Sequence, residues 1–284
     1  MLPRISVITP SYNQADFLEE CITSVLQQNY PNLEYIVIDG ASTDGSEKLI
    51  RNYEAHLSYW TSEPDKGQSQ AINKGLKRAT GDIVCWLNSD DYFHEGALAR
   101  VSEAWLRSSD KNKFWCIGDA HELDEATGQL LPNPSDRDCS VERLTWGHRI
   151  CQPASFWSRA LDLYLDESLH YAMDWELCVR IAHKTRAVFL SEYLAVSRLY
   201  ESTNTSTGGR KMADEYYRVC RKYGNKPIVA WTYRYMRWEL SYRYRQNPNP
   251  KSITFRAWSK LNHRILPWIF GPKYNRYYMW DFFT

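Results

Sequence analysis

The chain has 284 residues, of which 43% are hydrophobic, enough for one large globular domain with an appendage. No segment reaches about 18 consecutive apolar residues, and the first residues lack a signal-peptide pattern, which argues against a membrane span or secretion. The seven cysteines show no C-x-x-C spacing, so a reduced, cytoplasmic protein is favoured over a disulfide framework. The net charge of +1 is unevenly distributed, because residues from Lys226 onward carry +9 and the preceding residues −8.

Strand and helix patterns alternate through the first hundred residues. An apolar strand at about 5–13 is closed by Pro10, and Asp16 with Glu19 forms the pattern of a capping box for a helix that ends near Gln28. Further strands are predicted at 35–39, 57–61 and 82–87, with helices after the loops 40–45 and 65–68. Repeated strand–helix units with short connections predict an α/β fold with a mostly parallel central sheet flanked by helices.

Polar side chains follow each of these strands. They are Tyr12 and Asn13, Asp39, Glu63 and Asp65, and Asn88 to Asp91. Because the carboxyl ends of parallel strands lie along one edge of a sheet, we expect them to converge. Asp90 and Asp91 would repel each other unless a cation lay between them, and oxygen ligands suit Mg²⁺ or Mn²⁺ held with a substrate diphosphate. The alternatives are a solvated acidic turn for this pair, a turn cap for Asp39 and a helix cap for Asp65.

Beyond Gly96 the order of elements changes. The patterns predict a helix at 97–107, a strand at 114–123, a hairpin turn at 124–128, a short helix at 141–146, a strand at 152–157, a strong helix at 172–182, and strands at 187–190 and 194–199. Asp174 lies in the first turn of the 172–182 helix. The helix dipole favours a carboxylate there, so capping is the alternative to a catalytic role.

The remainder of the chain is basic, aromatic and helical in pattern. Aromatic residues recur at helical spacing from Trp231 to Tyr242, and a second stripe runs over 255–265. These stripes either pack on the body or form an interfacial surface for an anionic membrane leaflet. Nucleic acid is not expected as a partner, because no nucleic-acid-binding module accompanies them. We therefore predict a body at 1–224 and a helical, basic and aromatic extension at 225–284.

Several short motifs occur in order along the body: T-P-S-Y-N at 9–13, I-D-G-A-S-T-D-G at 38–45, S-E-P-D-K-G-Q at 62–68, A-I-N-K-G at 71–75, L-N-S-D-D at 87–91 and M-D-W-E-L at 173–177. With these motifs, residues 5–206 resemble a family 2 glycosyltransferase with the GT-A fold. The resemblance implies an inverting, metal-dependent hexosyltransferase, with a UDP-sugar as the favoured donor. The acceptor would be a hydroxyl of a saccharide or lipid-linked saccharide in polysaccharide or glycan biosynthesis. Residues 1–95 would bind the nucleotide, and residues 96–224 would shape the acceptor side. The protein would act at the cytoplasmic face of the membrane if the extension attaches there.

The same resemblance assigns roles by position. The nucleotide-binding residues would be Pro10, Tyr12, Asn13, Asp39, Asp65, Gln68, Asn73, Ser89 and Asp90. The acceptor and sugar side would be formed by Asn88, Gln152, Trp175 and Glu176. Asp39 would accept a hydrogen bond from the imide N–H of uracil. Asp91, with Asp90, would ligate Mn²⁺ or Mg²⁺ on the diphosphate, and Asp174 would be the general base for the acceptor hydroxyl.

The chain departs from the family pattern at two positions. Asn88 stands where the D-x-D segment often begins with Asp, and Tyr200 stands where relatives frequently have His. A neutral tyrosine is a poor metal ligand, so the metal would depend more on water and phosphate.

Two other functions fit part of the sequence. Nucleotidyl transfer to a sugar phosphate would require a Gly-rich loop with Arg and Lys after the first strand, which residues 11–14 do not supply. The other is a catalytically silent nucleotide-sugar or glycan binder, against which the joint presence of Asp90, Asp91 and Asp174 counts.

Overall fold

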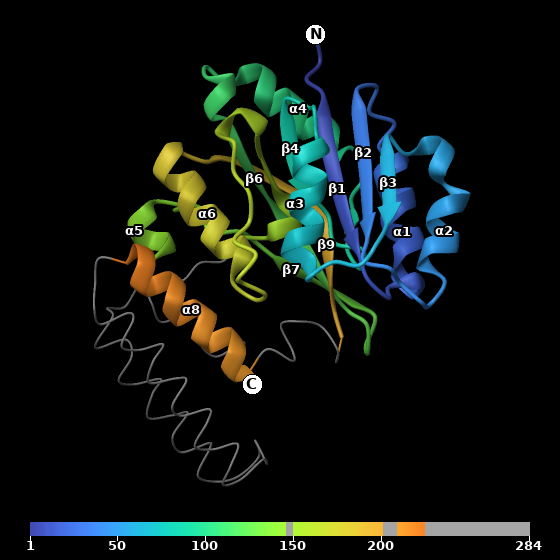
Figure 1. Ribbon diagram of the computed structural model, residues 1–284. Helices are drawn as coiled ribbons and strands as arrows, with labels where there is room; N and C mark the ends of the chain where they lie inside the picture. Colours follow the sequence, from blue (N-terminus) through green and yellow to red (C-terminus); the bar gives the residue numbers. More distant parts are fainter. Residues whose placement is uncertain (146–149, 201–208, 225–284) are drawn as a thin grey trace, which may run out of the picture. The chain divides into compact units, whose positions relative to one another are not determined.

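The computed structural model describes residues 1–145, 150–200 and 209–224 (Figure 1). The predicted extension at 225–284, with both aromatic stripes, lies outside the described residues. The chain divides into two compact units. The first contains the described residues of 1–144 and 150–200, and the second contains Thr145 and helix α8 (Gly209–Tyr223). The predicted division at residue 224 stays a prediction.

The first unit begins with the predicted parallel strand–helix repeats. Its first four strands are β1 (Ile5–Ser11), β2 (Leu33–Asp39), β3 (Tyr59–Ser62) and β4 (Ile83–Trp86). They pair in parallel in the order β3-β2-β1-β4. The helices that follow β1, β2 and β3 are α1 (Ala15–Leu26), α2 (Ser46–Asn52) and α3 (Gln68–Arg78), with the 3-10 turn η1 (Glu54–His56) after α2. The predicted α/β fold is confirmed.

The later strands make the sheet mixed. They are β5 (Tyr92–Phe93), β6 (Trp115–Asp124), β7 (Gln129–Asn133), β8 (Ser155–Ser158) and β9 (Val188–Leu199). The order continues β4-β8-β6-β9-β5, with β7 on β6, and only the β6–β9 pairing in this half is parallel. The remaining elements are α4 (Ala97–Arg107), η2 (Lys111–Lys113), α5 (Val141–Leu144), η3 (Gln152–Ala154), η4 (Arg159–Leu161) and α6 (Met173–Lys184). Because β9 also pairs with β5, its end lies beside the segment that follows β4.

The predicted capping box at the start of the first helix is wrong. Helix α1 begins at Ala15, its N-cap is Gln14, and no side chain caps it. The Ala15 N–H donates instead to Oδ2 of Asp44, 2.8 Å away in the loop before α2. This partner is 29 residues distant in sequence, so a local pattern could not reveal it.

Two strand predictions also change in detail. The segment predicted as a strand at 152–157 starts as the turn η3 and becomes extended only in β8. The strands predicted at 187–190 and 194–199 form one strand, β9, which pairs along β6 with an irregularity near Asp119. The hairpin predicted at 124–128 is confirmed by the antiparallel pairing of β6 with β7.

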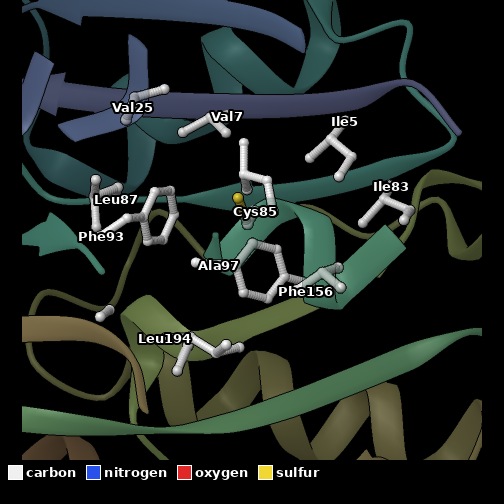
Figure 2. Close-up of a cluster of buried hydrophobic side chains, with 14 of the residues drawn as sticks. Ile5, Val7, Val25, Ile83, Cys85, Leu87, Phe93, Ala97, Phe156 and Leu194 are labelled. Carbon is white, nitrogen blue, oxygen red and sulfur yellow. The ribbon is translucent and has the colours of Figure 1, made fainter. Parts of the chain in front are cut away.

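The hydrophobic core covers both faces of β1. Val7 packs with Val25 of α1, Cys85 of β4 and residues of α4 on one face (Figure 2). Successive strand residues point to opposite faces, and Ile8 accordingly meets α3 at Gly75 on the other. Burial of both faces explains the continuous apolar run in this strand, since each fully buried aliphatic side chain contributes about 1.5–3 kcal/mol.

The described residues include all seven cysteines, and all of them are buried. Over the same part of the chain, none of the helices is both long and apolar enough to cross a membrane.

Candidate active site

The ends of the first three strands lie side by side. The sheet register aligns Ser11 of β1 with Asp39 of β2, and Asp39 with Ser62 of β3. The next residue after β2 is Gly40, where a Cβ atom would lie 2.9 Å from Oδ2 of Asp65 and 3.1 Å from Cδ2 of Tyr12. Tyr12 and Asp65 therefore both lie against Gly40. Pro10 is buried within β1, one residue before this edge.

The carboxylate of Asp39 anchors the loop that follows β2. Its side chain is 0% exposed. Oδ1 accepts a hydrogen bond from Ser42 Oγ (2.5 Å), and Oδ2 accepts from Ser42 N (2.9 Å) and Ser62 Oγ (2.6 Å). A uracil imide would have to compete with these donors, so the base contact of Asp39 stays a prediction.

The loops after β1 and β2 are tied together. Asn13, which adopts a positive φ of 51°, accepts a hydrogen bond from Thr43 N at Oδ1 (2.9 Å). Its own N–H donates to Ser42 Oγ (2.8 Å). The neighbouring Tyr12 is 63% exposed, which leaves its ring accessible to a ligand.

Asp65 shapes the start of α3. Its Oδ1 accepts a hydrogen bond from the Gly67 N–H (2.8 Å), and Gly67 has a φ of 121° that side-chain-bearing residues rarely adopt. The turn places Gln68 at the first position of α3. Asp65 therefore stabilises the turn ahead of α3 and does not cap the helix, whose N-cap is Gly67 without a side-chain hydrogen bond. Its nucleotide contact stays a prediction.

The carboxylate pair after β4 is oriented from several directions. Asp91 is 5% exposed, and it accepts hydrogen bonds from Asn88 Nδ2 (3.1 Å) and from the backbone N–H of Arg198 (3.3 Å). Asp90 accepts a hydrogen bond from the Tyr200 hydroxyl at Oδ2 (2.8 Å). Burial, followed by the negative charge of Asp90, raises the pKa of Asp91 well above its ordinary value. The environment thus disfavours a second negative charge, which a cation would compensate.

The arginine near this carboxylate pair is already paired with other acidic side chains. The Arg198 guanidinium is 7% exposed and forms ion pairs with Glu20 and Glu125. Burial and the charge of Asp90 raise the pKa of the Tyr200 phenol, so this residue is a neutral donor. No cluster of three or more His, Cys, Asp or Glu residues that could hold a metal occurs within 1–145, 150–200 and 209–224. The donor set fits a divalent cation held by two carboxylates and completed by phosphate and water.

An amide network connects this pair to other predicted residues. Gln68 Nε2 donates to Asn88 Oδ1 (2.7 Å), and Asn88 Nδ2 donates to Gln152 Oε1 (3.1 Å). Gln152 Nε2 in turn donates to the Trp86 carbonyl (2.8 Å). Gln68, Asn88 and Gln152, from three separate segments, therefore meet beside Asp91. Ser89, between Asn88 and the carboxylate pair, is buried.

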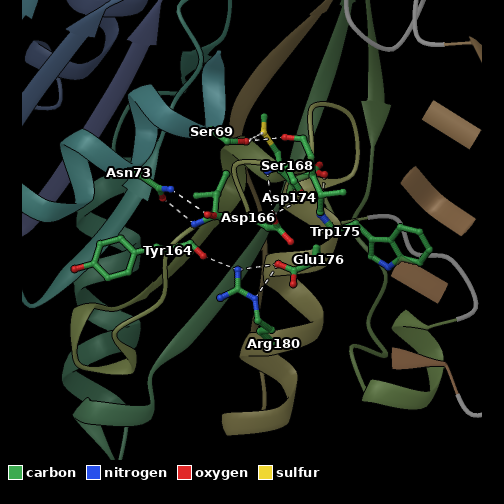
Figure 3. A network of polar contacts seen from close by, with 12 residues as sticks. Ser69, Asn73, Tyr164, Asp166, Ser168, Asp174, Trp175, Glu176 and Arg180 are labelled. Carbon is green, nitrogen blue, oxygen red and sulfur yellow. Dashed lines mark hydrogen bonds and ion pairs between the residues drawn. The ribbon is translucent and has the colours of Figure 1, made fainter. Parts of the chain in front are cut away.

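Asp174 lies at the start of α6, close to the start of α3 (Figure 3). Ser69 Oγ donates to the Leu169 carbonyl (2.9 Å) and lies 2.8 Å from Met173 Sδ. Asp174 is partly exposed, and its Oδ1 accepts a hydrogen bond from the Trp175 N–H (2.7 Å). Since Gln68 precedes Ser69, α3 links the segment of Asp174 to the network around Asp91.

Asn73 has structural partners. This buried residue donates from Nδ2 to the Leu165 carbonyl and to Glu167 Oε1, both at 3.0 Å (Figure 3). Its Oδ1 accepts from the Leu165 N–H (2.8 Å). Both amide protons are thus used in fixing the loop before α6, and a nucleotide contact stays a prediction.

Trp175 and Glu176 point into the protein. The Trp175 indole N–H donates to the Leu144 carbonyl (2.7 Å), and its side chain is buried. Glu176 is buried and forms an ion pair with Arg180 (2.8 Å). The Trp175 hydrogen bond ties α6 to the end of α5, whereas the Glu176–Arg180 pair lies within α6. An acceptor-side role for either residue stays a prediction.

Sequence reasoning missed Ser42 and Ser62. Ser42 follows Asp39 by three residues, a spacing typical of a turn in which the aspartate bonds the backbone ahead, so a local signal was present. Ser62 reaches Asp39 only through the β2–β3 register. No local pattern could have indicated that contact.

The sequence is similar to those of known glycosyltransferases. Residues 6–127 match the model described as Glycosyl transferase family 2. TuaG of Bacillus subtilis, named "Putative teichuronic acid biosynthesis glycosyltransferase", is 39% identical over 112 residues, which cover 38% of this chain and 44% of TuaG. The uncharacterized glycosyltransferase RT0329 of Rickettsia typhi is 27% identical over 226 residues, 75% of this chain and 69% of that protein. The chain thus spans less than half of TuaG.

Solved structures share the fold. TarS residues 1–349 of S. aureus, in complex with UDP-GlcNAc, aligns with a TM-score of 0.62 and 18% identity over 93% of this chain and 81% of that one. The mannosyltransferase PcManGT from Pyrobaculum calidifontis, in complex with GDP-Man and Mn²⁺, also aligns with a TM-score of 0.62. Its sequence identity is 17%, and the alignment covers 98% of this chain and 89% of that one. The GT-A fold expected from the sequence is confirmed.

Proposed function

We propose that this chain, of which residues 6–127 match the model of glycosyl transferase family 2, moves a hexose from a UDP-sugar to a saccharide hydroxyl with inversion of configuration. The observation that carries the proposal is the buried Asp91 beside Asp90, at the sheet edge where Tyr12 and Asp65 lie against Gly40. The complex of TarS with UDP-GlcNAc supports a UDP-sugar as the donor.

The nucleoside would lie near Tyr12 and Asp65, with its diphosphate directed to Asp90 and Asp91. These carboxylates would hold Mn²⁺ or Mg²⁺, and the Mn²⁺ in the PcManGT complex supports such an ion. Bound there, the ion would act as a Lewis acid on the leaving diphosphate. The chain's own contribution is to orient the carboxylates, through Asn88, the Arg198 backbone and Tyr200.

Asp174 would act as the general base. An acceptor hydroxyl is a weak nucleophile, and a carboxylate within hydrogen-bond reach removes its proton as the new bond to the anomeric carbon forms. The bond from that carbon to the UDP oxygen breaks at the same time, and the proton remains on Asp174. One attack from the face opposite UDP requires one base and no covalent sugar intermediate.

The name of TuaG supports an acceptor in polysaccharide biosynthesis. A catalytically silent binder of nucleotide-sugars is the second candidate, because buried partners account for Asn73, Trp175 and Glu176 without catalysis.

Turnover with a panel of UDP-sugars separates these candidates. The full chain is incubated with Mn²⁺ and each UDP-sugar in turn, and the release of UDP is measured. The anomeric configuration of the sugar in the first product is determined by NMR. We expect UDP release with one donor class, loss of release with EDTA, and inverted configuration. Binding of every donor without turnover would support the silent binder, and a retained configuration would contradict inversion.

We further propose that residues 225–284 attach the protein to the cytoplasmic membrane face, near a lipid-linked acceptor. The support is their local charge of +9 and their aromatic stripes. The full chain should float with vesicles that contain anionic lipid and remain behind with neutral vesicles. Equal recovery with both vesicle types would contradict an electrostatic attachment.

A further inference from the structure

Asn88 occupies the centre of the amide network beside the carboxylate pair. Its Nδ2 donates to Asp91 Oδ2 and to Gln152 Oε1, both at 3.1 Å. Its Oδ1 accepts from Gln68 Nε2 (2.7 Å). An amide nitrogen has two protons, so both donors of this side chain are used.

The backbone of Asn88 is fixed as well. Its carbonyl oxygen accepts hydrogen bonds from the Asp91 N–H (3.0 Å) and from the Cys21 thiol (3.3 Å). Burial is the main cause that raises the pKa of Cys21 to about 12, so the thiol keeps the proton that it donates. Asn88 and Asp91 therefore form one closed turn with little freedom to rotate.

The direction of the amide network is set by a backbone carbonyl. Trp86 O can only accept, so Gln152 must direct Nε2 towards it and Oε1 towards Asn88. Asn88 must then direct Nδ2 towards Gln152 and Asp91. Rotating the Asn88 amide by half a turn would place its oxygen against two acceptors and its nitrogen against the Gln68 donor.

We propose that Asn88 is a positioning residue for the carboxylate of Asp91, and that Gln152 fixes its orientation from the Trp86 carbonyl. This inference rests on the proposed function, in which Asp91 holds the cation that accompanies UDP. Asn88 acts through Asp91, and Gln152 acts through Asn88. Partners that orient a metal ligand typically change metal affinity about 10–100-fold when they are removed.

The test uses UDP, so that contacts to the transferred sugar do not enter. The variants are Asn88→Leu, Gln152→Met and the double substitution, all in the full chain. Asn52→Leu, at the exposed last residue of α2, is the matched control. The apparent Kd of Mn²⁺ is measured by calorimetry at fixed UDP, corrected for the complex of Mn²⁺ with free UDP, and Tm is recorded for each protein.

We expect Asn88→Leu to raise the apparent Kd of Mn²⁺ by about 10–100-fold. Gln152→Met should raise it by a smaller factor, and the double variant should equal Asn88→Leu, because the two residues act in series. The control should match the wild type. Gln152→Met alone remains informative if Asn88→Leu does not fold.

The positioning role of Asn88 and Gln152 would be overturned if the apparent Kd of Mn²⁺ stayed unchanged in Asn88→Leu or in Gln152→Met. It would also be overturned if the effects of the two substitutions multiplied in the double variant. In each of these cases the wild type still binds Mn²⁺ with UDP, and the proposed function stands. A wild-type protein without Mn²⁺-dependent UDP binding would overturn the proposed function and this inference together.

Discussion

Three of the aspartates in the candidate site, Asp39, Asp91 and Asp174, differ in environment, and we propose different tasks for them. Asp39 is fully buried under donors from two serines, which suits an anchor of the loop after β2. Asp91 is buried beside the charge of Asp90, which suits a cation ligand. Asp174 is partly exposed at the start of α6, which suits exchange of a proton with an acceptor.

Replacing Asp174 with Asn tests its assignment as the base. The change keeps the side-chain shape and removes proton acceptance, so kcat should fall about 100-fold or more. The Kd of UDP with Mn²⁺ should stay within about twofold, because the base contacts the acceptor. Initial rates and calorimetry provide the two values. Asp110→Asn is the control, since Asp110 caps the exposed turn η2 and asparagine caps equally well. Near-normal turnover of Asp174→Asn would remove it from this role.

For single residues, the sequence indicated candidates for the site but not the partners of their side chains. The order of motifs indicated Asp90, Asp91 and Asp174, and the structure links the segments that contain them. The sequence could not indicate that Asn73 forms a hydrogen bond with Leu165, because that partner lies 92 residues further along the chain. A polar residue in a motif has the same sequence signal whether it contacts a ligand or a distant loop.

Among the elements, α3 is central because it contacts the sheet, Asn88 and the segment before α6. It packs tightly against β1 at Gly75, where a Cβ atom would overlap Cγ2 of the buried, β-branched Ile8. Alanine would favour the helix by up to about 1 kcal/mol, whereas overpacking costs about 1–3 kcal/mol. Overpacking should outweigh propensity here, because a buried β-branched side chain cannot easily rotate away.

Gly75→Ala should therefore lower the free energy of unfolding by up to about 2 kcal/mol, the overpacking cost of about 1–3 kcal/mol less about 1 kcal/mol gained in helix propensity. Urea denaturation followed by circular dichroism measures it. Lys77→Ala, at an exposed position near the end of the same helix, is the control and should change stability by less than about 0.5 kcal/mol. A Gly75→Ala protein more stable than the wild type would show that α3 can move away from β1 without cost.

Glu34 joins β2 to neighbouring segments. Its carboxylate accepts from Ser6 Oγ (2.5 Å) and from Thr80 N and Oγ1 (both 2.7 Å), with Arg4 at 3.1 Å. Burial by itself would raise the pKa of this group, but the hydrogen bonds and the Arg4 charge outweigh it, so the pKa is lowered. The stabilisation is thus present above the unfolded pKa of about 4.3 and is lost as pH falls through the folded value.

Glu34→Gln should destabilise the fold by about 1.5–3 kcal/mol at pH 7, since an amide nitrogen would face donors. The difference from wild type should shrink as pH falls below about 4.3. Urea denaturation at several pH values measures it, with Glu47→Gln, an exposed helix pair with Arg51, as the control. A difference that stays constant with pH would contradict the ionised role of Glu34.

In the whole molecule, the first unit supplies every candidate site residue. The alternating patterns predicted the strands and helices of its parallel half, in which β2 pairs with β1 and β3, the strands one repeat away, while β4 pairs with β1 across two intervening strands. The order β4-β8-β6-β9-β5 could not be predicted, since β9 reaches β6 across more than sixty residues and returns Arg198 to Asp91. The contact between the Arg198 backbone and Asp91 helps to orient the carboxylate pair. It depends on strand pairing between residues far apart in the sequence.

The central claim is that Asp90 and Asp91 bind one divalent cation together with the diphosphate of the donor. Calorimetric titration of UDP into the wild type and Asp91→Asn, each with Mn²⁺ and with EDTA, tests it most directly. We predict that Mn²⁺ tightens wild-type binding at least about tenfold, and that Asp91→Asn binds UDP equally weakly under both conditions. A wild type indifferent to Mn²⁺, or an Asp91→Asn protein that responds like the wild type, would contradict the account.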